Sequence, residues 1–311
     1  MKATKIELRK GDSLKLLEEL ESDSIDLILI DPPYGTVKDI AKDSNLNFGM
    51  KNKTGWDTAI CPKILFKHSE RVLRENGTLL VCSQDPYSFD LLNKQHINLP
   101  FTYKYIWVKD HFANSLIAKK APVNYYEEIL CFVKKYDFNN KNPLRQYSKN
   151  ILKFINKKSC KAVNDDLGHR KAEHFFYIES TQFKLCTEIV YEELTNYYNL
   201  NEMQDYKSFE ELKELNFKFS RIFNLENGKK IKSNVLNYKK DYLGHHPTQK
   251  PVALFEDLIK TYSNDGDLVL DMFAGSGTTG VACQNLNRNC IMIEKEEEYC
   301  NIILERLKYN Q

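Results

Sequence analysis

The chain has 311 residues, of which 42% are hydrophobic and 28% charged, so it can bury a substantial core beneath a very polar surface. No apolar run approaches the roughly 20 residues that a membrane span needs, and residues 1–10 lack the apolar centre of a signal peptide. None of the eight cysteines forms a Cys-x-x-Cys pair, which indicates free thiols. These features disfavour membrane, secreted and zinc-finger proteins, and they predict a cytoplasmic protein without a metal site.

The net charge of +2 conceals a strong asymmetry along the chain. Residues 1–138 carry a net charge of +1, residues 139–240 of +6, and residues 241–311 of −5. A basic middle between a neutral and an acidic flank favours contact with a polyanion. Charge alone does not separate this interpretation from a lysine-rich surface that has no partner.

The first 138 residues alternate between strand and helix patterns. Residues 25–31 (IDLILID) are mostly apolar and β-branched up to a Pro-Pro pair, which predicts a buried strand. The polar segment from Gly35 to Trp56 predicts a mobile loop. Residues 62–75 predict a helix that ends at Asn76-Gly77. Further strands are expected over residues 78–83, 103–109 and 128–134.

The last 71 residues show the same alternation of strand and helix patterns. Their patterns predict a helix over 249–262, a strand over 267–273, a helix over 278–286, a strand over 290–294 and a helix over 296–307. Strand–helix alternation in both flanks predicts an α/β fold, in which one doubly wound, Rossmann-like, mostly parallel sheet is assembled from the two chain ends. The expected core halves are residues 1–138 and 241–311.

The middle, residues 139–240, differs in composition. It contains only two glycines and one proline, so it is not a flexible linker, and it holds 15 of the 37 aromatic residues. Helix-like stretches lie around residues 188–198 and 209–216. We therefore expect an inserted, mostly helical domain with its own small core.

A glycine-rich turn follows the strand that ends near Asp271. Gly275, Gly277 and Gly280 satisfy the G-x-G-x-x-G pattern, which allows a tight turn and close approach of a ligand to the backbone. Glu294, at the end of the next strand, is placed to bind the ribose hydroxyls of an adenosine ligand. The carboxylate of Asp271 suits the positive charge of S-adenosylmethionine better than the pyrophosphate of NAD, although both ligands stay open at this point.

The second motif is Asp31-Pro32-Pro33-Tyr34, which ends the apolar strand predicted over residues 25–31. Two prolines fix the backbone and donate no hydrogen bonds, so the Pro32 carbonyl is free to accept one. With the Asp31 carboxylate and the Tyr34 ring, the motif suits a planar heterocycle that bears an exocyclic amino group. Acceptors on both N–H bonds favour a pyramidal nitrogen, which can attack a sulfonium methyl group directly.

Together these motifs resemble the amino-group DNA methyltransferases, which modify N6 of adenine or N4 of cytosine. DPPY at 31–34 matches their catalytic motif, DMFAGSG at 271–277 their S-adenosylmethionine motif, and HPTQKP at 246–251 the segment that precedes it. The motif order resembles the beta subgroup, with residues 139–240 as the target recognition domain. Aspartate at the first motif position favours adenine, and the substrate implied is double-stranded DNA with its target base flipped out onto Tyr34.

The resemblance also implies site residues and partners. The catalytic residues would be Asp31, Pro32, Pro33 and Tyr34. The residues that hold S-adenosylmethionine would be Asp12, Thr248, Lys250, Asp271, Phe273, Gly275, Gly277, Thr278 and Glu294, with Thr248 and Lys250 at its methionine end. A restriction endonuclease partner and a homodimer are compatible with the family and are not indicated by the sequence.

The basic residues of the middle segment are candidates for contacts with DNA. Lysines suit phosphates, and the arginine fork suits guanine. The phosphate candidates are Lys149, Lys153, Lys157, Lys158 and Lys161, and the base-reading candidates are Arg145, Arg170 and Arg221. Three alternatives remain: an NAD-linked oxidoreductase, an inactive DNA-binding protein, and an enzyme that acts on cytosine N4 or on RNA. The adjacent His245 and His246 do not predict a metal site, because neighbouring side chains rarely converge on one ion.

Overall fold

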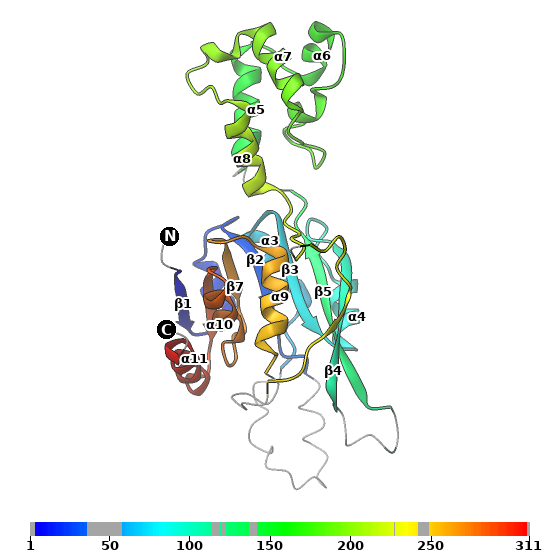
Figure 1. The fold of residues 1–311 in the computed structure, drawn as a ribbon, viewed down its shortest axis with the longest axis vertical. Coiled ribbons are helices and arrows are strands. Elements are labelled where there is room, and N and C mark those ends of the chain that lie inside the picture. Colours follow the sequence, from blue (N-terminus) through cyan, green and yellow to red (C-terminus); the bar gives the residue numbers. More distant parts are fainter. Residues whose placement is uncertain are drawn as a thin grey trace. The chain divides into compact units, whose positions relative to one another are not determined.

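The computed structural model describes residues 4–35, 58–113, 119, 122–136, 142–226, 228–241 and 249–309. The chain forms two compact units (Figure 1). The first, here called the sheet unit, comprises Met1–Lys134 and Ile222–Gln311, and the second, the helical unit, comprises Lys135–Arg221. Both chain ends therefore contribute to one unit, and the middle of the chain forms the other.

One sheet of eight strands, in the order β1-β8-β7-β2-β3-β5-β4-β6, forms the centre of the sheet unit. The pairs from β1 to β3 are parallel, β5 is antiparallel to both of its neighbours, and β6 is parallel to β4. The mostly parallel, doubly wound sheet is confirmed. The strands are β1 (Ile6–Lys10), β2 (Ile25–Ile30), β3 (Leu73–Ser83), β4 (Phe101–Ala113), β5 (Asn124–Val133), β6 (Val235–Asn237), β7 (Leu268–Asp271) and β8 (Asn289–Glu294).

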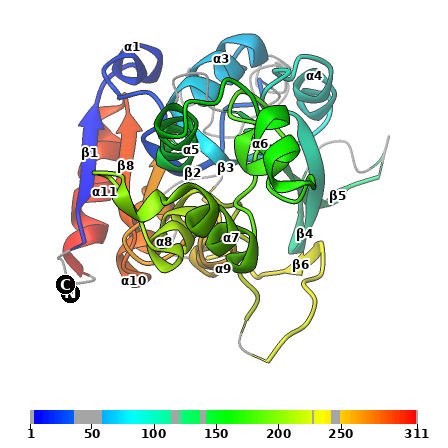
Figure 2. The ribbon, with the colours of Figure 1, turned by 90° about the horizontal axis from the view of Figure 1, so that it is seen from above.

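Helices cover both faces of this sheet (Figure 2). Alternate residues of the central strand β2 enter two different cores, Ile28 and Ile30 on one face and Leu27 and Leu29 on the other. A strand buried on both faces must be apolar on both, which explains the apolar run of β2. The first face is covered by α1 (Ser13–Glu18), α3 (Pro62–Val72) and α4 (Tyr87–Asn93), and the second by α9 (Val252–Tyr262), α10 (Thr278–Asn285) and α11 (Glu297–Tyr309). None of the helices in the described ranges is long and apolar enough to cross a membrane.

One predicted helix end is wrong. The helix expected over residues 62–75 ends at Val72, and Asn76-Gly77 lies inside β3 instead of closing the helix. Leu73 already has extended backbone and pairs with Ile25 of β2, so burial in the sheet ends the helix early. A Cβ atom on Gly77 would lie 2.8 Å from Leu73 Cγ, so the glycine permits a close approach within the strand.

The boundary expected at residue 240 also differs from the structure. Residues 222–240 belong to the sheet unit, because β6 pairs with β4 and the Asn224 amide donates to the carbonyl of Thr261 at 2.8 Å. This segment carries five lysines against one glutamate, whereas the helical unit carries fifteen basic against thirteen acidic residues. Most of the +6 assigned to the insert therefore lies beside the sheet.

The helical unit has its own apolar core, which includes Phe175, Tyr191 and Leu212. The Tyr147 and Tyr191 hydroxyls lie 2.7 Å apart, so the buried polar ends of these rings pair with each other. The predicted helices over 188–198 and 209–216 are both present. The helices are α5 (Pro143–Phe154), α6 (Cys160–Leu167), α7 (Glu188–Tyr198) and α8 (Phe209–Phe219), with short 3₁₀ turns at Glu173–Phe176 and Leu200–Glu202.

Candidate active site

The glycine-rich turn connects β7 to α10. Gly275 and Gly277 have φ values of +51° and +80°, in the left-handed region that favours glycine. A Cβ atom on Gly277 would lie 2.8 Å from Ile303 Cγ1, whereas a Cβ on Gly275 would meet no atom within 4 Å. Gly277 is therefore required for packing against α11, and Gly275 leaves open space in front of the turn.

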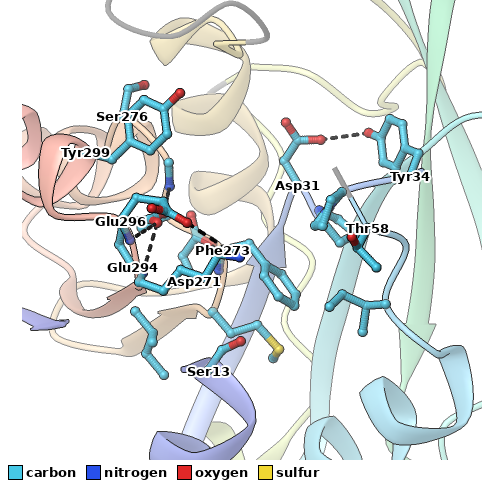
Figure 3. A pocket seen from close by; sticks show the side chains of 18 of the residues that line it. Ser13, Asp31, Tyr34, Thr58, Asp271, Phe273, Ser276, Glu294, Glu296 and Tyr299 are labelled. Atoms are coloured by element: carbon cyan, nitrogen blue, oxygen red, sulfur yellow. Dashed lines mark hydrogen bonds and ion pairs between the residues drawn. The ribbon is translucent and has the colours of Figure 1, made fainter. Parts of the chain in front are cut away.

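Glu294 closes one side of this turn. Its Oε2 accepts a hydrogen bond from the Gly275 amide at 2.8 Å, and its Oε1 accepts from the amides of Lys295 and Glu296, each at 2.9 Å (Figure 3). A carboxylate has about four acceptor positions, so one remains, on Oε2. Burial raises the pKa of Glu294, and the three amides oppose that effect. The side chain is thus fixed, with one acceptor left for a ligand.

Asp271 stabilises the turn from within. Its Oδ1 accepts from the Phe273 amide at 3.0 Å, and its Oδ2 accepts from the Thr279 hydroxyl. Burial raises the pKa of Asp271 to about 7, against the effect of these two hydrogen bonds. Each carboxylate oxygen therefore has one partner within the turn, and Asp271 also lines the pocket, so its predicted role toward a cationic ligand stays a prediction.

Asp31 lies at the carboxyl end of β2 in a buried cluster of charges. The Tyr34 hydroxyl donates to Asp31 Oδ1 at 2.7 Å, and Lys250 Nζ donates to Asp31 Oδ2 at 2.6 Å. Lys250 Nζ also lies 3.1 Å from Glu127 Oε2, a contact with ion-pair distance but without hydrogen-bond geometry. Glu127 Oε1 accepts in turn from Lys109 Nζ at 2.9 Å. Carboxylates and ammonium groups therefore alternate in the order Asp31, Lys250, Glu127 and Lys109.

Burial and charge act against each other in this cluster. Burial raises the pKa of Asp31, and the Lys250 ammonium partly offsets it. Burial alone would lower the pKa of Lys250, but the Asp31 and Glu127 carboxylates raise it, so Lys250 stays protonated. Burial likewise favours the neutral form of Glu127, but Lys250 and Lys109 lower its pKa. The cluster therefore holds its charges through mutual compensation.

A pocket of about 540 Å³ joins the two motifs (Figure 3). Its walls come from the glycine-rich turn, the end of β8, the start of α1 and the end of β2. The residues predicted from the sequence that line it are Asp12, Asp31, Pro32, Pro33, Tyr34, Lys250, Asp271, Phe273, Gly275, Thr278 and Glu294. The pocket therefore places the DPPY tetrapeptide opposite a turn of the kind that binds adenosine.

Comparison with known proteins agrees with this geometry. Residues 25–305 match the model of a family described as DNA methylase. The chain belongs to the DNA methylase family. The type II methyltransferase M.HpaI of Haemophilus parainfluenzae is 27% identical over 96% of this chain and 72% of its own length. The DNA adenine methyltransferase YhdJ of Escherichia coli (strain K12) is 28% identical over 96% of this chain and 81% of its own length. The solved structure of M1.HpyAVI in complex with SAM has a TM-score of 0.52 at 20% identity, over 97% of this chain and 98% of that one.

The family assignment confirms the predicted methyltransferase fold, DNA methylation as the activity and S-adenosylmethionine as the cofactor. The role of each site residue in this DNA methylase stays a prediction. Thr248, His245, His246 and most of the loop predicted over 35–56 lie outside the described residues. In the described ranges, no group of three or more His, Cys, Asp or Glu side chains is arranged to hold a metal ion.

Lys250 makes a contact that the sequence did not predict. Its ammonium contacts Asp31, at the catalytic motif, and its place at the methionine end of the cofactor stays a prediction. The sequence also missed Glu127, although an acidic pair in an otherwise apolar strand is a signal that could have revealed it. It missed Gln249 as well, whose buried Nε2 has no hydrogen-bond partner among the described residues and which lines the pocket.

Arg145 of this DNA methylase does not fit a base-reading role. Its guanidinium is buried and donates to the carbonyls of Ile178 and Ser180, at 2.6 and 2.9 Å. It also lies over the rings of Tyr136 and Phe183. Arg145 therefore holds the helical unit together. Of the predicted phosphate contacts, Lys157 is paired with Asp166 at 2.6 Å, and the exposed ones are Lys149, Lys153, Lys158 and Lys161.

Proposed function

We propose that this DNA methylase transfers the methyl group of S-adenosylmethionine to N6 of adenine in double-stranded DNA. The observation that carries the proposal is the Asp31 carboxylate, which Tyr34 and Lys250 fix in the same pocket as Gly275 and Glu294. Adenine is favoured over cytosine by aspartate at the first position of the motif. A relative with 28% identity is itself named a DNA adenine methyltransferase.

The pocket offers the groups that S-adenosylmethionine requires. The open space at Gly275 and the remaining acceptor on Glu294 Oε2 are available to a ligand with ribose hydroxyls, and Gln249 lines the same pocket. Phe273 supplies an apolar wall, and Asp12 and Thr278 line the same space. When bound, S-adenosylmethionine supplies an electrophilic methyl group on a sulfonium.

The Asp31 carboxylate acts on the amino group of the target base. Each of its oxygens accepts one hydrogen bond within the protein and keeps a second lone pair for an N–H of the base. An N–H bond held in this way favours a pyramidal nitrogen whose lone pair is free to attack. The nitrogen gains the methyl carbon as the S–CH₃ bond breaks with its electron pair left on sulfur, and it must then lose a proton. Burial raises the pKa of Asp31, so this carboxylate can accept the proton.

Lys250 and Glu127 are positioning residues in this scheme. The Lys250 ammonium holds Asp31 Oδ2, and Glu127 holds the ammonium from the other side. Tyr34 fixes the other oxygen, Asp31 Oδ1, through its hydroxyl. The Tyr34 ring also stacks on Tyr87, with ring centroids 6.0 Å apart. The carboxylate is thereby oriented before the base arrives, which is the main way a site without covalent chemistry lowers a barrier.

The target base must leave the duplex, because its N6 lies inside the base stack. We assign target recognition to the helical unit, whose exposed lysines in α5 and α6 are available to phosphates. The basic segment 222–240 adds a second set of lysines on the sheet unit. Binding that uses these lysines should weaken steeply with salt.

The test is methyl transfer from labelled S-adenosylmethionine to unmethylated plasmid DNA, followed by digestion to nucleosides and mass spectrometry. We expect the label in N6-methyldeoxyadenosine. Label in N4-methyldeoxycytidine would overturn the choice of base. A failure to bind S-adenosylmethionine or to label any DNA would overturn the proposal as a whole.

A further inference from the structure

An exposed aromatic pair lies where β4 ends and β5 begins. This is the edge of the sheet at which β2 ends and Asp31 follows, here called the catalytic edge. Because β4 is parallel to β2, its carboxyl end lies at the same edge as Asp31. Phe112 of β4 and Tyr125 of β5 are 47% and 49% exposed, and their ring centroids are 5.8 Å apart. Two large rings that pack on each other in solvent indicate a surface that meets a partner.

The register of β5 places this pair beside the pocket. Side chains two residues apart lie on the same face of a strand, so Tyr125 shares its face with Glu127, roughly 7 Å farther along. Glu127 lines the pocket and contacts Lys250, the partner of Asp31. The aromatic pair therefore lies on the face of β5 that carries Glu127, here called the catalytic face, farther from the pocket than Glu127. Tyr126, which is 45% exposed, lies on the opposite face.

The chain that follows β6 brings two lysines toward this edge of the sheet. β6 pairs with β4, and the chain that follows it stays alongside, since the Lys240 amide donates to Asp110 Oδ1 at 3.3 Å. Because β6 runs parallel to β4, the lysines after it, Lys240 and the exposed Lys239, lie toward the same edge as the ring pair, whereas the other three lysines of the segment 222–240 precede β6. A ring pair flanked by cations suits a strand of nucleic acid, in which π-faces and phosphates alternate.

We propose that Phe112 and Tyr125 stack on nucleobases next to the base that enters the pocket. This inference rests on the proposed function. Extrusion of a base breaks the stacking of its neighbours, and the rings replace part of that stacking. The pair thus stabilises the opened duplex without reading its sequence, because every base presents a π-face.

The test compares the Phe112→Ala/Tyr125→Ala double variant with the wild type on unmethylated plasmid DNA. We expect its KM for DNA to rise roughly tenfold or more, the effect of losing about one base–aromatic stack. The affinity for S-adenosylmethionine and the unfolding midpoint should stay unchanged, because both rings are exposed. The ring-retaining variant Phe112→Tyr/Tyr125→Phe should keep the wild-type KM within about twofold.

Tyr126→Ala is the matched control, since it removes a similarly exposed ring one residue away on the other face. Its KM should stay within about twofold of the wild type. A wild-type KM in the double variant would overturn the inference and leave the proposed function intact. An equal rise in KM for Tyr126→Ala would also overturn it, because the effect would not depend on the catalytic face. A wild-type protein that methylates no DNA would overturn the proposed function and the inference with it.

Discussion

Lys250 Nζ lies 2.6 Å from Asp31 Oδ2, although 219 positions separate the two residues in the chain. The same ammonium lies 3.1 Å from Glu127 Oε2. The end of β2, the strand β5 and the segment before α9 therefore meet in one cluster of charges. A buried cation between two carboxylates compensates both, so the loss of one member leaves uncompensated charge on the others.

Replacing Lys250 by methionine should lower kcat for methyl transfer at least ~100-fold, because Asp31 loses the group that orients it. Loss of the positive charge also raises the pKa of Asp31 further, so the acid limb of the kcat–pH profile should move to higher pH. The control is Lys94→Met, which removes an exposed lysine paired with Asp90. It should leave kcat and the acid limb of the kcat–pH profile unchanged. An acid limb at the wild-type pH in Lys250→Met would show that Lys250 does not act through Asp31.

Asp271→Asn should change how stability depends on pH. Burial raises the pKa of Asp271 to about 7, so between about pH 4 and 7 the folded state holds a proton that the unfolded state has released. Stability from this group is therefore lost as the pH rises through that window. Urea unfolding at pH 8 should find the variant more stable, by at most about 4 kcal/mol.

The same variant should bind S-adenosylmethionine more weakly in calorimetry, because Asp271 fixes the turn that lines the pocket. Asp90→Asn, at an exposed position, provides the comparison and should keep the wild-type pH dependence. If Asp271→Asn and the wild type lose stability in parallel from pH 5 to 8, the raised pKa of Asp271 is contradicted.

Gly277→Ala should destabilise the sheet unit by more than backbone strain alone. Its φ of +80° costs a side chain about 1 kcal/mol, and the 2.8 Å approach to Ile303 Cγ1 adds roughly 1–3 kcal/mol. Gly168→Ala is a matched variant, with φ of +72° and no atom within 4 Å. Urea unfolding monitored by hydrogen exchange in each unit measures both costs. Equal costs would show that α11 does not constrain the turn.

Arg145→Ala should destabilise the helical unit by about 3 kcal/mol, because two buried carbonyls lose a charged donor. The methylated DNA sequence should not change. Arg170 has a side chain that is 74% exposed, so Arg170→Ala should lower the free energy of unfolding by less than about 0.5 kcal/mol. An Arg145→Ala protein of wild-type stability that methylates a different sequence would restore the base-reading role.

Strong local patterns made part of the fold predictable. The strand β2 is buried on both faces, so its apolar run and the Pro-Pro pair after it identify both the element and its end. The glycine-rich turn is similarly local, since Asp271, Gly275 and Gly277 lie within seven consecutive positions. Such features need no knowledge of distant contacts.

Long-range pairing accounts for what the sequence did not reveal. The strand β6 has three residues and only Leu236 buried, so no periodicity marks it, and it forms by pairing with β4. The basic segment around it was therefore assigned to the insert. In the same way, Lys250 was visible as part of a motif, but its partner Glu127 is brought to it by the register of β5.

The most direct test is single-molecule sequencing of DNA from cells that produce either the wild-type protein or Asp31→Ala, with modified bases detected at single-base resolution. The account predicts N6-methyladenine within one recurring sequence for the wild type and none for Asp31→Ala. N4-methylcytosine in place of N6-methyladenine, or undiminished N6-methyladenine with Asp31→Ala, would contradict it.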